Sequence, residues 1–287
     1  MSVDTTSPDS PSDTRDFHSH FADRDYLQHV QYANGRNLSR RMAIHERFST
    51  NKYGWHRWVF DHLITDPDAR VLELGCGTAE LWTKNAARVP NRWHVLVSDL
   101  SSGMVKQARG SLVATGLAFA YAVADAQAIP FRSDAFDCVI ANHMLYHVPN
   151  LDTALSEVRR VLRSGGVFYA ATNGRDHLRE KRALVAEFDP TIRWSSGGAA
   201  ARFSLENGAS ILSLFFSEIA VHHYRDSLEV TEAEPLVEYV ASTLADPSLP
   251  LSGDRLAAFR DFVQRRLLDQ GVIRVTKDPG LFLARKL

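Results

Sequence analysis

The sequence predicts an α/β fold built on a doubly wound, mainly parallel sheet. Short, nearly continuous apolar runs alternate with stretches of helical periodicity between residues 70 and 172. Such runs are typical of parallel strands, because helices cover both faces of the sheet and bury both sets of side chains. Glycines follow the first run, and acidic residues follow the second and third. The chain has 287 residues, 45% hydrophobic and 23% charged, which excludes a mainly disordered or fibrous protein.

The expected elements alternate along the chain. Seven strands are predicted at residues 70–74, 93–98, 119–124, 136–142, 167–172, 218–226 and 281–287, the last running antiparallel to its neighbour. Helices are predicted at 79–89, 101–115, 151–162, 175–188, 205–216, 232–244 and 253–269. The strand–helix alternation places the first five strands in βαβ units.

The N-terminal region has a different character. Residues 1–16 are rich in Ser, Thr, Pro and Asp, so we expect a disordered tail. Residues 17–66 are predicted to form a helical lid, because apolar residues recur there at three- and four-residue spacing. The remaining residues, 67–287, form the main domain, with an insertion at about 175–210 expected to cover a substrate. The polar lid candidates are Tyr26, Tyr32, Arg40, Arg41 and His45, whereas Trp55 and Trp58 are expected in the core.

The charge and the cysteine content exclude several classes of binding partner and site. Lys+Arg 33 against Asp+Glu 34 gives a net charge of -1, which argues against a broad basic face for nucleic acid. Cys76 and Cys138 are too few and too far apart for a disulfide framework or a cysteine metal site. We see no secretory signal and no apolar run of the roughly 20 residues that span a bilayer. We therefore expect a cytoplasmic protein that binds neither nucleic acid nor membrane, and a homo-oligomer is left open.

A glycine-containing turn follows the first predicted strand, in the sequence ELGCGTA at residues 73–79. Gly75 and Gly77 allow a tight turn and a close approach of a ligand to the backbone. A dinucleotide fingerprint would need a third glycine where Glu80 stands, and a carboxylate there opposes a pyrophosphate. With Glu73 before the glycines, the turn favours a cationic or neutral ligand over the cofactor of a nicotinamide dehydrogenase.

Two further acids end neighbouring strands. Asp99 lies 22 residues after Gly77, at the distance where an acid accepts hydrogen bonds from ribose hydroxyls, and Asp125 follows the third strand. Three acids at successive strand ends would line one crevice. A nucleoside that carries a sulfonium and an amino group matches this pattern, and S-adenosylmethionine is such a compound. Singly, Asp99 could instead be a helix N-cap, Asp125 a loop acid, and the glycines ordinary turn residues.

Five segments then resemble, in order, the motifs of class I S-adenosylmethionine-dependent methyltransferases of the type 11 branch. The segments are VLELGCGTAE, SDLSSGM, VADAQAIPF, FDCVIANHMLYHV and LSEVRRVLRSGGVFYAATNG. The resemblance covers about residues 69–173 and implies a Rossmann-like, mainly parallel seven-stranded sheet with S-adenosylmethionine as cofactor. One departure is Ala79, where many members carry a third glycine; we expect little effect on binding because alanine is small.

The resemblance also implies roles for individual residues. Glu73, Gly75 and Gly77 would surround the methionine part and the ribose, and Asp99 would hold the ribose hydroxyls. The remaining cofactor contacts expected from the family are Leu100, Met104, Asp125, Ala126 and Asn142. Leu100 would pack on the adenine, Asp125 would bond its amino group, and Asn142 would face the methionine amino group.

The methyl acceptor is less well defined by the sequence. His143 follows the fourth strand and is the leading candidate for a base or polar orienting group, because imidazole titrates near neutral pH. A histidine that packs against the cofactor is an equal alternative, and a metal site with His147 is not favoured because no third ligand accompanies the pair. Tyr26 is proposed to contact substrate from the lid. Glu206 could anchor an amine or accept an indole N–H, although a helix-capping role is slightly favoured.

These observations favour methyl transfer to a small molecule without a metal. The aromatic and histidine content suggests a flat acceptor, such as an indole-like or alkaloid natural product, methylated on carbon or nitrogen. A small-molecule O-methyltransferase is the near alternative. A nucleic-acid methyltransferase and a non-catalytic cofactor-binding protein are alternatives of other classes, and the sequence Asn142-His143-Met144-Leu145 lacks the Asn-Pro-Pro-Tyr-like tetrapeptide typical of the former.

Overall fold

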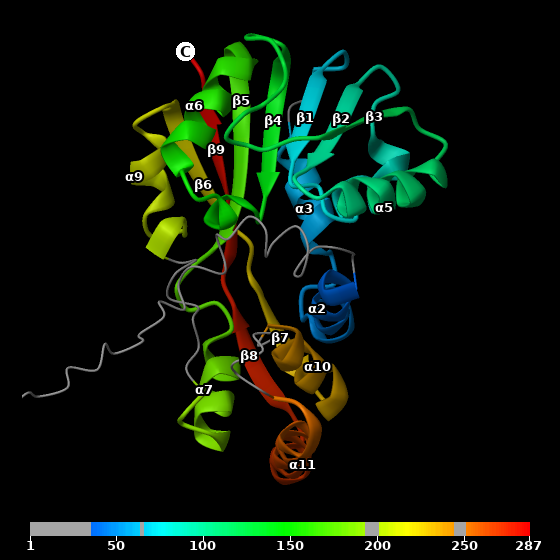
Figure 1. The fold of residues 1–287 in the computed structure, drawn as a ribbon, viewed down its shortest axis with the longest axis vertical. Helices are drawn as coiled ribbons and strands as arrows, with labels where there is room; N and C mark the ends of the chain where they lie inside the picture. The colour runs from blue at the N-terminus through cyan, green and yellow to red at the C-terminus, as the bar shows by residue number, and fades with distance from the viewer. Residues whose placement is uncertain (1–35, 64–65, 193–200, 244–250) are drawn as a thin grey trace, which may run out of the picture.

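A seven-stranded sheet forms the upper part of the molecule in the computed structural model (Figure 1). The structure describes residues 36–63, 66–192, 201–243 and 251–287. The strand order is β3-β2-β1-β4-β5-β9-β6. Its members are β1 (Arg70–Leu74), β2 (His94–Asp99), β3 (Phe119–Val123), β4 (Phe136–Asn142), β5 (Leu162–Asn173), β6 (Ser217–His223) and β9 (Pro279–Arg285). Strands β1 to β5 pair in parallel, whereas β9 pairs antiparallel with both β5 and β6.

Helices cover both faces of this sheet because alternate strand residues point to opposite sides. One face packs on α3 (Trp55–Asp61), α4 (Glu80–Thr83) and α5 (Ser102–Val113), and its core includes Val59, Trp82 and Leu112. The other face packs on α6 (Leu151–Val161) and α9 (Gly208–Leu212). Short 3-10 turns, η3 (Ala86–Arg88) and η4 (Leu145–His147), complete the connections. The polar residue that precedes α5 or α6 caps that helix: Ser101 accepts from Met104 N, and Asn150 accepts from Thr153 N.

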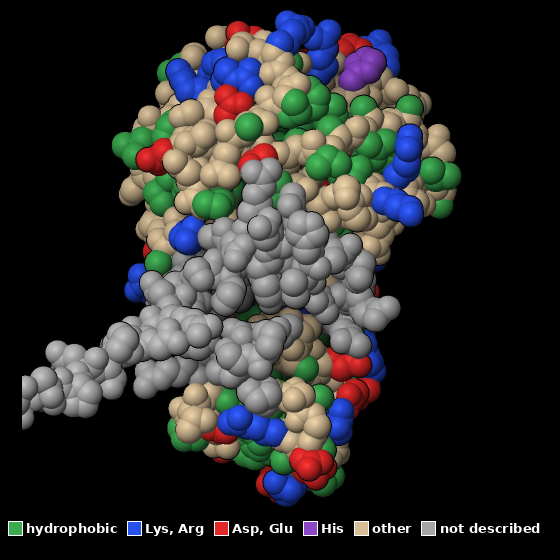
Figure 2. Space-filling view, in the orientation of Figure 1, with side chains coloured by type: hydrophobic (Ala, Val, Ile, Leu, Met, Phe, Trp, Pro, Cys, Tyr) green, Lys and Arg blue, Asp and Glu red, His purple; other side chains and the backbone are tan. Residues whose placement is uncertain are grey.

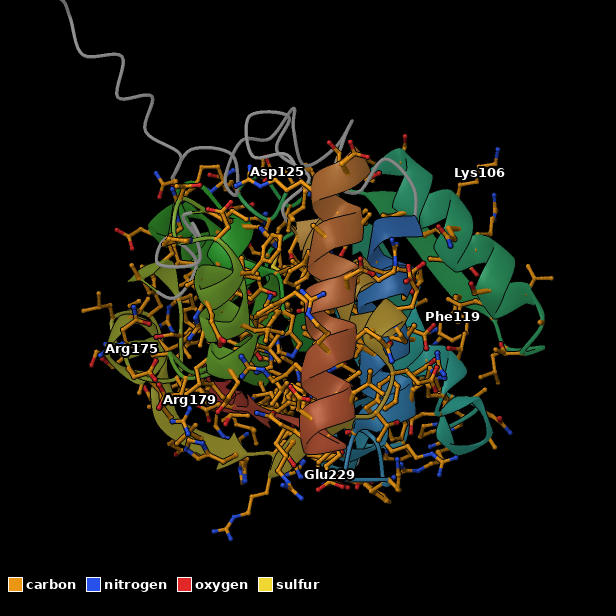
Figure 3. The ribbon with its side chains drawn as sticks, turned by 90° about the horizontal axis from the view of Figure 1, so that it is seen from below. Lys106, Phe119, Asp125, Arg175, Arg179 and Glu229 are labelled. Carbon is orange, nitrogen blue, oxygen red and sulfur yellow. The ribbon has the colours of Figure 1, made fainter. Side chains whose placement is uncertain are left out.

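A second lobe lies below the carboxyl ends of the parallel strands (Figure 1). It contains α7 (Arg179–Phe188), α10 (Ala233–Thr243), α11 (Gly253–Gln270) and an antiparallel pair, β7 (Asp226–Val230) with β8 (Ile273–Lys277). Helix α2 (Arg36–Phe48) joins it by burying Ile44 and Phe48 in the lobe's own core. Figure 3 shows α11 crossing the molecule in the view from below. Because β7 follows β6 and β8 precedes β9, one long ribbon links the sheet to the lobe.

The predicted α/β class with a mainly parallel seven-stranded sheet is confirmed, and so is the antiparallel last strand. The sequence patterns missed β7 and β8, and the predicted helix at 79–89 is divided into α4 and η3. Most of the lobe is formed by residues 226–277. The insertion expected near 175–210 contributes α7 to it. The predicted tail, Tyr26 and Tyr32 lie outside the described residues.

Candidate active site

One cavity of 710 Å³ lies where the sheet, α2 and the lobe meet. The residues predicted to bind cofactor all line it: Glu73, Gly75, Gly77, Asp99, Leu100, Met104, Asp125, Ala126 and Asn142. They converge because β1, β2 and β4 end at the same edge of the sheet, while Asp125 and Ala126 follow β3. Such a crevice beyond the carboxyl ends of parallel strands is the usual ligand position in open α/β sheets.

The glycine turn is shaped by left-handed backbone conformations. Gly75 has φ +67, and a Cβ there would come within 2.8 Å of Met144 Cβ. Gly77 has φ +53, and its N–H donates to Asp99 Oδ2 at 3.0 Å. Ala79 also adopts a left-handed conformation, with φ 65, which costs a non-glycine residue roughly 1–2 kcal/mol. Ala79 therefore adopts the left-handed backbone conformation that glycine would favour, at the position where many family members carry a third glycine.

Asp99 is held by backbone donors and remains beside the cavity. Its Oδ1 accepts from Ser101 N at 2.9 Å, and its Oδ2 accepts from Gly77 N. Burial raises the pKa of Asp99, although these N–H donors act in the opposite direction. The carboxylate is thus fixed between the first two βα turns, where a ribose diol could donate hydrogen bonds to it.

Glu73 is the most deeply buried acid of the cavity, with 1% of its surface exposed. Its Oε2 accepts from Trp82 Nε1 at 2.6 Å. Burial raises the pKa of Glu73 to about 7, Trp82 lowers it, and the neighbouring Asp99 raises it. A buried acid of this kind is stabilised in its charged form when a cation binds next to it, which fits the positive methionine end of S-adenosylmethionine.

Trp55 contributes to the site although the sequence placed it in the core. It packs against the core at the start of α3, and it also lines the cavity. Its Nε1 donates to Asn142 Oδ1 at 3.2 Å, and its ring centroid lies 5.0 Å from that of His143. The sequence offered no signal for this contact, because 87 residues separate the tryptophan from its partner.

His143 directly follows β4 and lines the cavity in a strained conformation. Its φ is 57, and its N–H donates to Ala171 O at 3.1 Å. The Nδ1 atom is buried and has no hydrogen-bond partner. Burial, followed by nearby His56, lowers the pKa of His143 to about 3, so the imidazole is neutral near pH 7.

The other two residues predicted to contact the acceptor, Glu206 and Tyr26, are not found in the cavity among the described residues. Glu206 is exposed and does not line the cavity, because its Oε1 accepts from Arg175 N at 2.8 Å and ties the β5–α7 connection to the segment before α9. The contact joins two connections and caps no helix, because α7 begins at Arg179 and α9 has no side-chain cap, and we build no acceptor role on it. Tyr26 lies outside the described residues, whereas the lid candidates Arg41 and His45 both line the cavity.

The lobe supplies residues that the sequence did not single out. Asn173, His177, Tyr239 and Lys277 line the cavity opposite the glycine turn, together with His45 from α2. They come from the end of β5, the connection to α7, α10 and β8. Nothing in their local patterns indicated a site, because only the tertiary fold brings them together. No group of three or more metal-ligating side chains occurs among the residues that the structure describes.

The fold and this cavity define a class I methyltransferase domain. Residues 72–170 match the family model of the type 11 branch, described as "Methyltransferase domain". The family predicted from the sequence is therefore confirmed.

Relatives share about half of the chain. The "Ubiquinone/menaquinone biosynthesis C-methyltransferase UbiE" of Vibrio cholerae is 33% identical over 140 residues, 48% of each protein. The "Malonyl-[acyl-carrier protein] O-methyltransferase" of Geobacter sulfurreducens is 38% identical over 115 residues, 40% of this chain and 42% of the relative. The chain thus spans about half the length of these relatives.

Solved structures support the fold. The YcgJ protein of Bacillus subtilis superposes with a TM-score of 0.54 at 17% identity, over 80% of this chain and 96% of the other. A possible histamine N-methyltransferase of Thermotoga maritima gives 0.52 at 15% identity, over 91% and 100%. At these identities the likeness concerns the architecture alone.

Proposed function

We propose that the protein is an S-adenosylmethionine-dependent methyltransferase that acts on a small, flat acceptor. The observation that carries the proposal is that Glu73, Asp99 and Asp125, from three neighbouring strands, line one cavity. Its volume of 710 Å³ lies in the range of about 300–1,000 Å³ that small-molecule sites occupy. The same cavity also contains a second set of polar groups, which come from α2 and the lobe: His45, Asn173, His177, Tyr239 and Lys277.

In this proposal, the residues of the cavity bind the cofactor and orient the acceptor. Asp99 would hold the ribose hydroxyls, Glu73 the positive methionine end, and the backbone of Gly75 and Gly77 would let the ligand approach closely. S-adenosylmethionine, when bound, supplies an activated methyl group, so the protein needs mainly to align the acceptor and exclude water. His143 and Trp55 lie at the end of β4, next to Asn142, where they can orient an acceptor.

The acceptor atom is part of the proposal. Carbon or nitrogen of an indole-like natural product remains the leading version from the sequence, with O-methylation as the alternative. The two relatives differ in the atom that their names give, carbon in one and oxygen in the other, so they do not choose between these versions.

A small acceptor is favoured over a nucleic acid. The net charge is -1, and on the face shown in Figure 2 basic and acidic side chains are interspersed over both parts of the molecule. Phosphate backbones are bound by clustered Lys and Arg side chains. Among the described residues, no helix is both long and apolar enough to cross a membrane.

Calorimetry with S-adenosylhomocysteine tests the cofactor half of the proposal. Wild-type protein should bind it, and Asp99→Ala should weaken binding by at least about tenfold, since hydrogen bonds to a buried charge are lost. Asp152→Ala, in the exposed first turn of α6, is the matched control and should leave affinity unchanged. Equal affinity of the Asp99→Ala variant and the wild type would refute the ribose role.

Turnover is tested separately. Mass spectrometry of reactions with indoles, phenols, amines and an RNA oligonucleotide should find a methylated product among the small molecules only. Methylation of the RNA alone would favour a nucleic-acid enzyme. Cofactor binding without any product across this panel would favour the non-catalytic alternative.

A further inference from the structure

The cavity has two chemically different walls. The carboxylates on it are Glu46, Glu73, Glu80, Asp99 and Asp125. Three of these belong to the strand ends described above, while Lys84 links Glu46 of α2 to Glu80 of α4, at 2.8 and 3.6 Å. The acceptor wall, by which we mean His45, Asn173, His177, Tyr239 and Lys277, includes no carboxylate among the residues described.

The two histidines of the acceptor wall are neutral hydrogen-bonding groups. Burial, followed by nearby Lys277, lowers the pKa of His45 to about 3, and burial lowers the pKa of His177. The Nδ1 of His177 accepts from Asp278 N at 3.1 Å, so its proton is on Nε2 and that nitrogen is a donor. The rings of His45 and His177 lie 6.4 Å apart, and the ring of Tyr239 lies 5.8 Å from His45.

His45 lacks the internal partner that a structural histidine would have. Its Nδ1 is buried without a hydrogen bond, as is Nδ1 of His143 on the other side of the cavity. Native proteins normally satisfy buried polar nitrogens with a protein group, water or a ligand. Two imidazoles that each have an unpartnered nitrogen line one cavity, and they therefore point to a ligand that forms hydrogen bonds.

Lys277 is a cation whose charge is already balanced. Its ammonium donates to Asp226, which also accepts from Ser49 and, at 2.9 Å, from Asn51 N. Lys277 and Ser49 line the cavity whereas Asp226 does not, so the carboxylate lies behind the ammonium as seen from the ligand. The ammonium can still donate to a ligand oxygen, but it does not offer a full uncompensated charge.

We propose that His45, His177 and Lys277 form a subsite for an aromatic acceptor with an acidic hydroxyl, such as a phenol or an enol. The neutral imidazole of His45 accepts the O–H hydrogen bond, while His177 Nε2–H and the Lys277 ammonium donate to the oxygen. Trp55 and Tyr239 supply aromatic surface for the ring. The inference rests on the proposed function, and it makes the hydroxyl oxygen, or a ring carbon that the hydroxyl activates, the methylated atom. The methyl–sulfur bond of S-adenosylmethionine breaks as the new bond forms, S-adenosylhomocysteine leaves, and the proton lost by the acceptor passes to the imidazole of His45.

The same groups disfavour the other ionic classes of acceptor. A protonated amine would meet no unpaired carboxylate on the acceptor wall. A carboxylate would bring in a full negative charge where Lys277 is already neutralised and the histidines are neutral, which is costly in a buried site. A hydroxyl arrives uncharged and satisfies one donor and one acceptor at once. The charged and titratable groups around His45 are Arg41, His143, His177, Lys181, Asp226, Tyr239 and Lys277.

Calorimetry on the complex with S-adenosylhomocysteine tests this with four probes on one ring: 4-nitrophenol, 4-nitroanisole, 4-nitrobenzylamine and 4-nitrobenzoate. At a pH where the phenol is protonated, 4-nitrophenol should bind at least about tenfold more tightly than 4-nitroanisole, because the ether cannot donate to an imidazole. Tighter binding of the amine or of the carboxylate than of the phenol would overturn the proposal.

Substitutions test which residues cause the preference for the phenol. His45→Phe keeps a ring against Tyr239 and should abolish the preference for the phenol over the anisole while leaving affinity for S-adenosylhomocysteine unchanged. His94→Phe, at the exposed start of β2, is the matched control. Lys277→Met should weaken phenol binding, and Lys106→Met is its control, since Lys106 points outward from α5 (Figure 3).

An unchanged phenol-to-anisole ratio in His45→Phe would refute the subsite. The wild-type probe series decides the ligand class without any variant, so loss of folding in one variant does not remove the test. If S-adenosylhomocysteine itself fails to bind, the proposed function fails first; if it binds and the phenol does not, only the subsite is refuted.

Discussion

Replacing Glu73 with glutamine should make the ligand-free protein more stable than the wild type, by an amount that grows as the pH rises from about 5 to about 8. Glu73 is 1% exposed, and burial raises its pKa to about 7 from an ordinary 4.5. An acid whose pKa is raised by folding binds more protons in the native state than in the unfolded state between these values. Stability therefore falls as pH rises through this window and stays reduced above it.

The size of the effect follows from the shift. A shift from 4.5 to about 7 corresponds to about 3 kcal/mol of lost stability at about pH 8, and to under about 1 kcal/mol at about pH 5. Glu73→Gln removes this cost, while the glutamine oxygen can still accept from Trp82 Nε1. The variant should gain about 2 kcal/mol relative to the wild type between these two pH values.

Urea unfolding of both proteins at both pH values measures the difference. All other titrating groups are shared, so they cancel in the comparison. The same variant should bind S-adenosylhomocysteine more weakly, because glutamine lacks the negative charge that we propose holds the positive methionine end. If the stability difference between variant and wild type is the same at both pH values, the buried, proton-binding state of Glu73 is wrong.

Three further substitutions test other parts of the site and its support. Gly75→Ala places a Cβ 2.8 Å from Met144 Cβ at a φ of +67, so unfolding free energy should fall by at least about 1–2 kcal/mol, measured by urea titration, and cofactor affinity should fall with it. His143→Ala should lower kcat on an identified acceptor more than it weakens calorimetric binding of S-adenosylhomocysteine; an unaltered rate would remove the residue from the mechanism. Asp137→Ala strips Arg70 N of its 2.6 Å acceptor between β1 and β4 and should cost about 1–3 kcal/mol, whereas Asp68→Ala, in an exposed pair with Arg92, should cost under about 1 kcal/mol.

The cofactor half of the site could be predicted from the sequence because its residues sit at the ends of consecutive strands. Gly75, Asp99 and Asp125 each follow a short apolar run, and a parallel sheet brings such ends to one edge. Local pattern and spacing were therefore enough to predict that these residues lie in one cavity. Their roles in binding stay predictions for the experiments above.

The acceptor half depends on contacts that no local pattern contains. Trp55 reads as a core residue in its helix, yet its indole reaches Asn142 across 87 positions. His177 and Lys277 are 100 positions apart in the chain, and the pairing of Asp278 N with His177 Nδ1 brings them to the same wall. Glu206 looked available from the sequence, but its carboxylate accepts from Arg175 N instead.

By itself, the sequence determined the layered α/β architecture, the methyltransferase family and the glycine turn that lines the cavity, because periodicity and strand-end chemistry act over a few residues at a time. Only the tertiary structure decided that β7 and β8 continue from the sheet's last strands into a lobe with its own core. It also decided that histidines and Lys277, which is paired with Asp226, line the cavity opposite the glycine turn. The physical reason is that burial and hydrogen-bond satisfaction of a side chain depend on what long-range packing puts beside it.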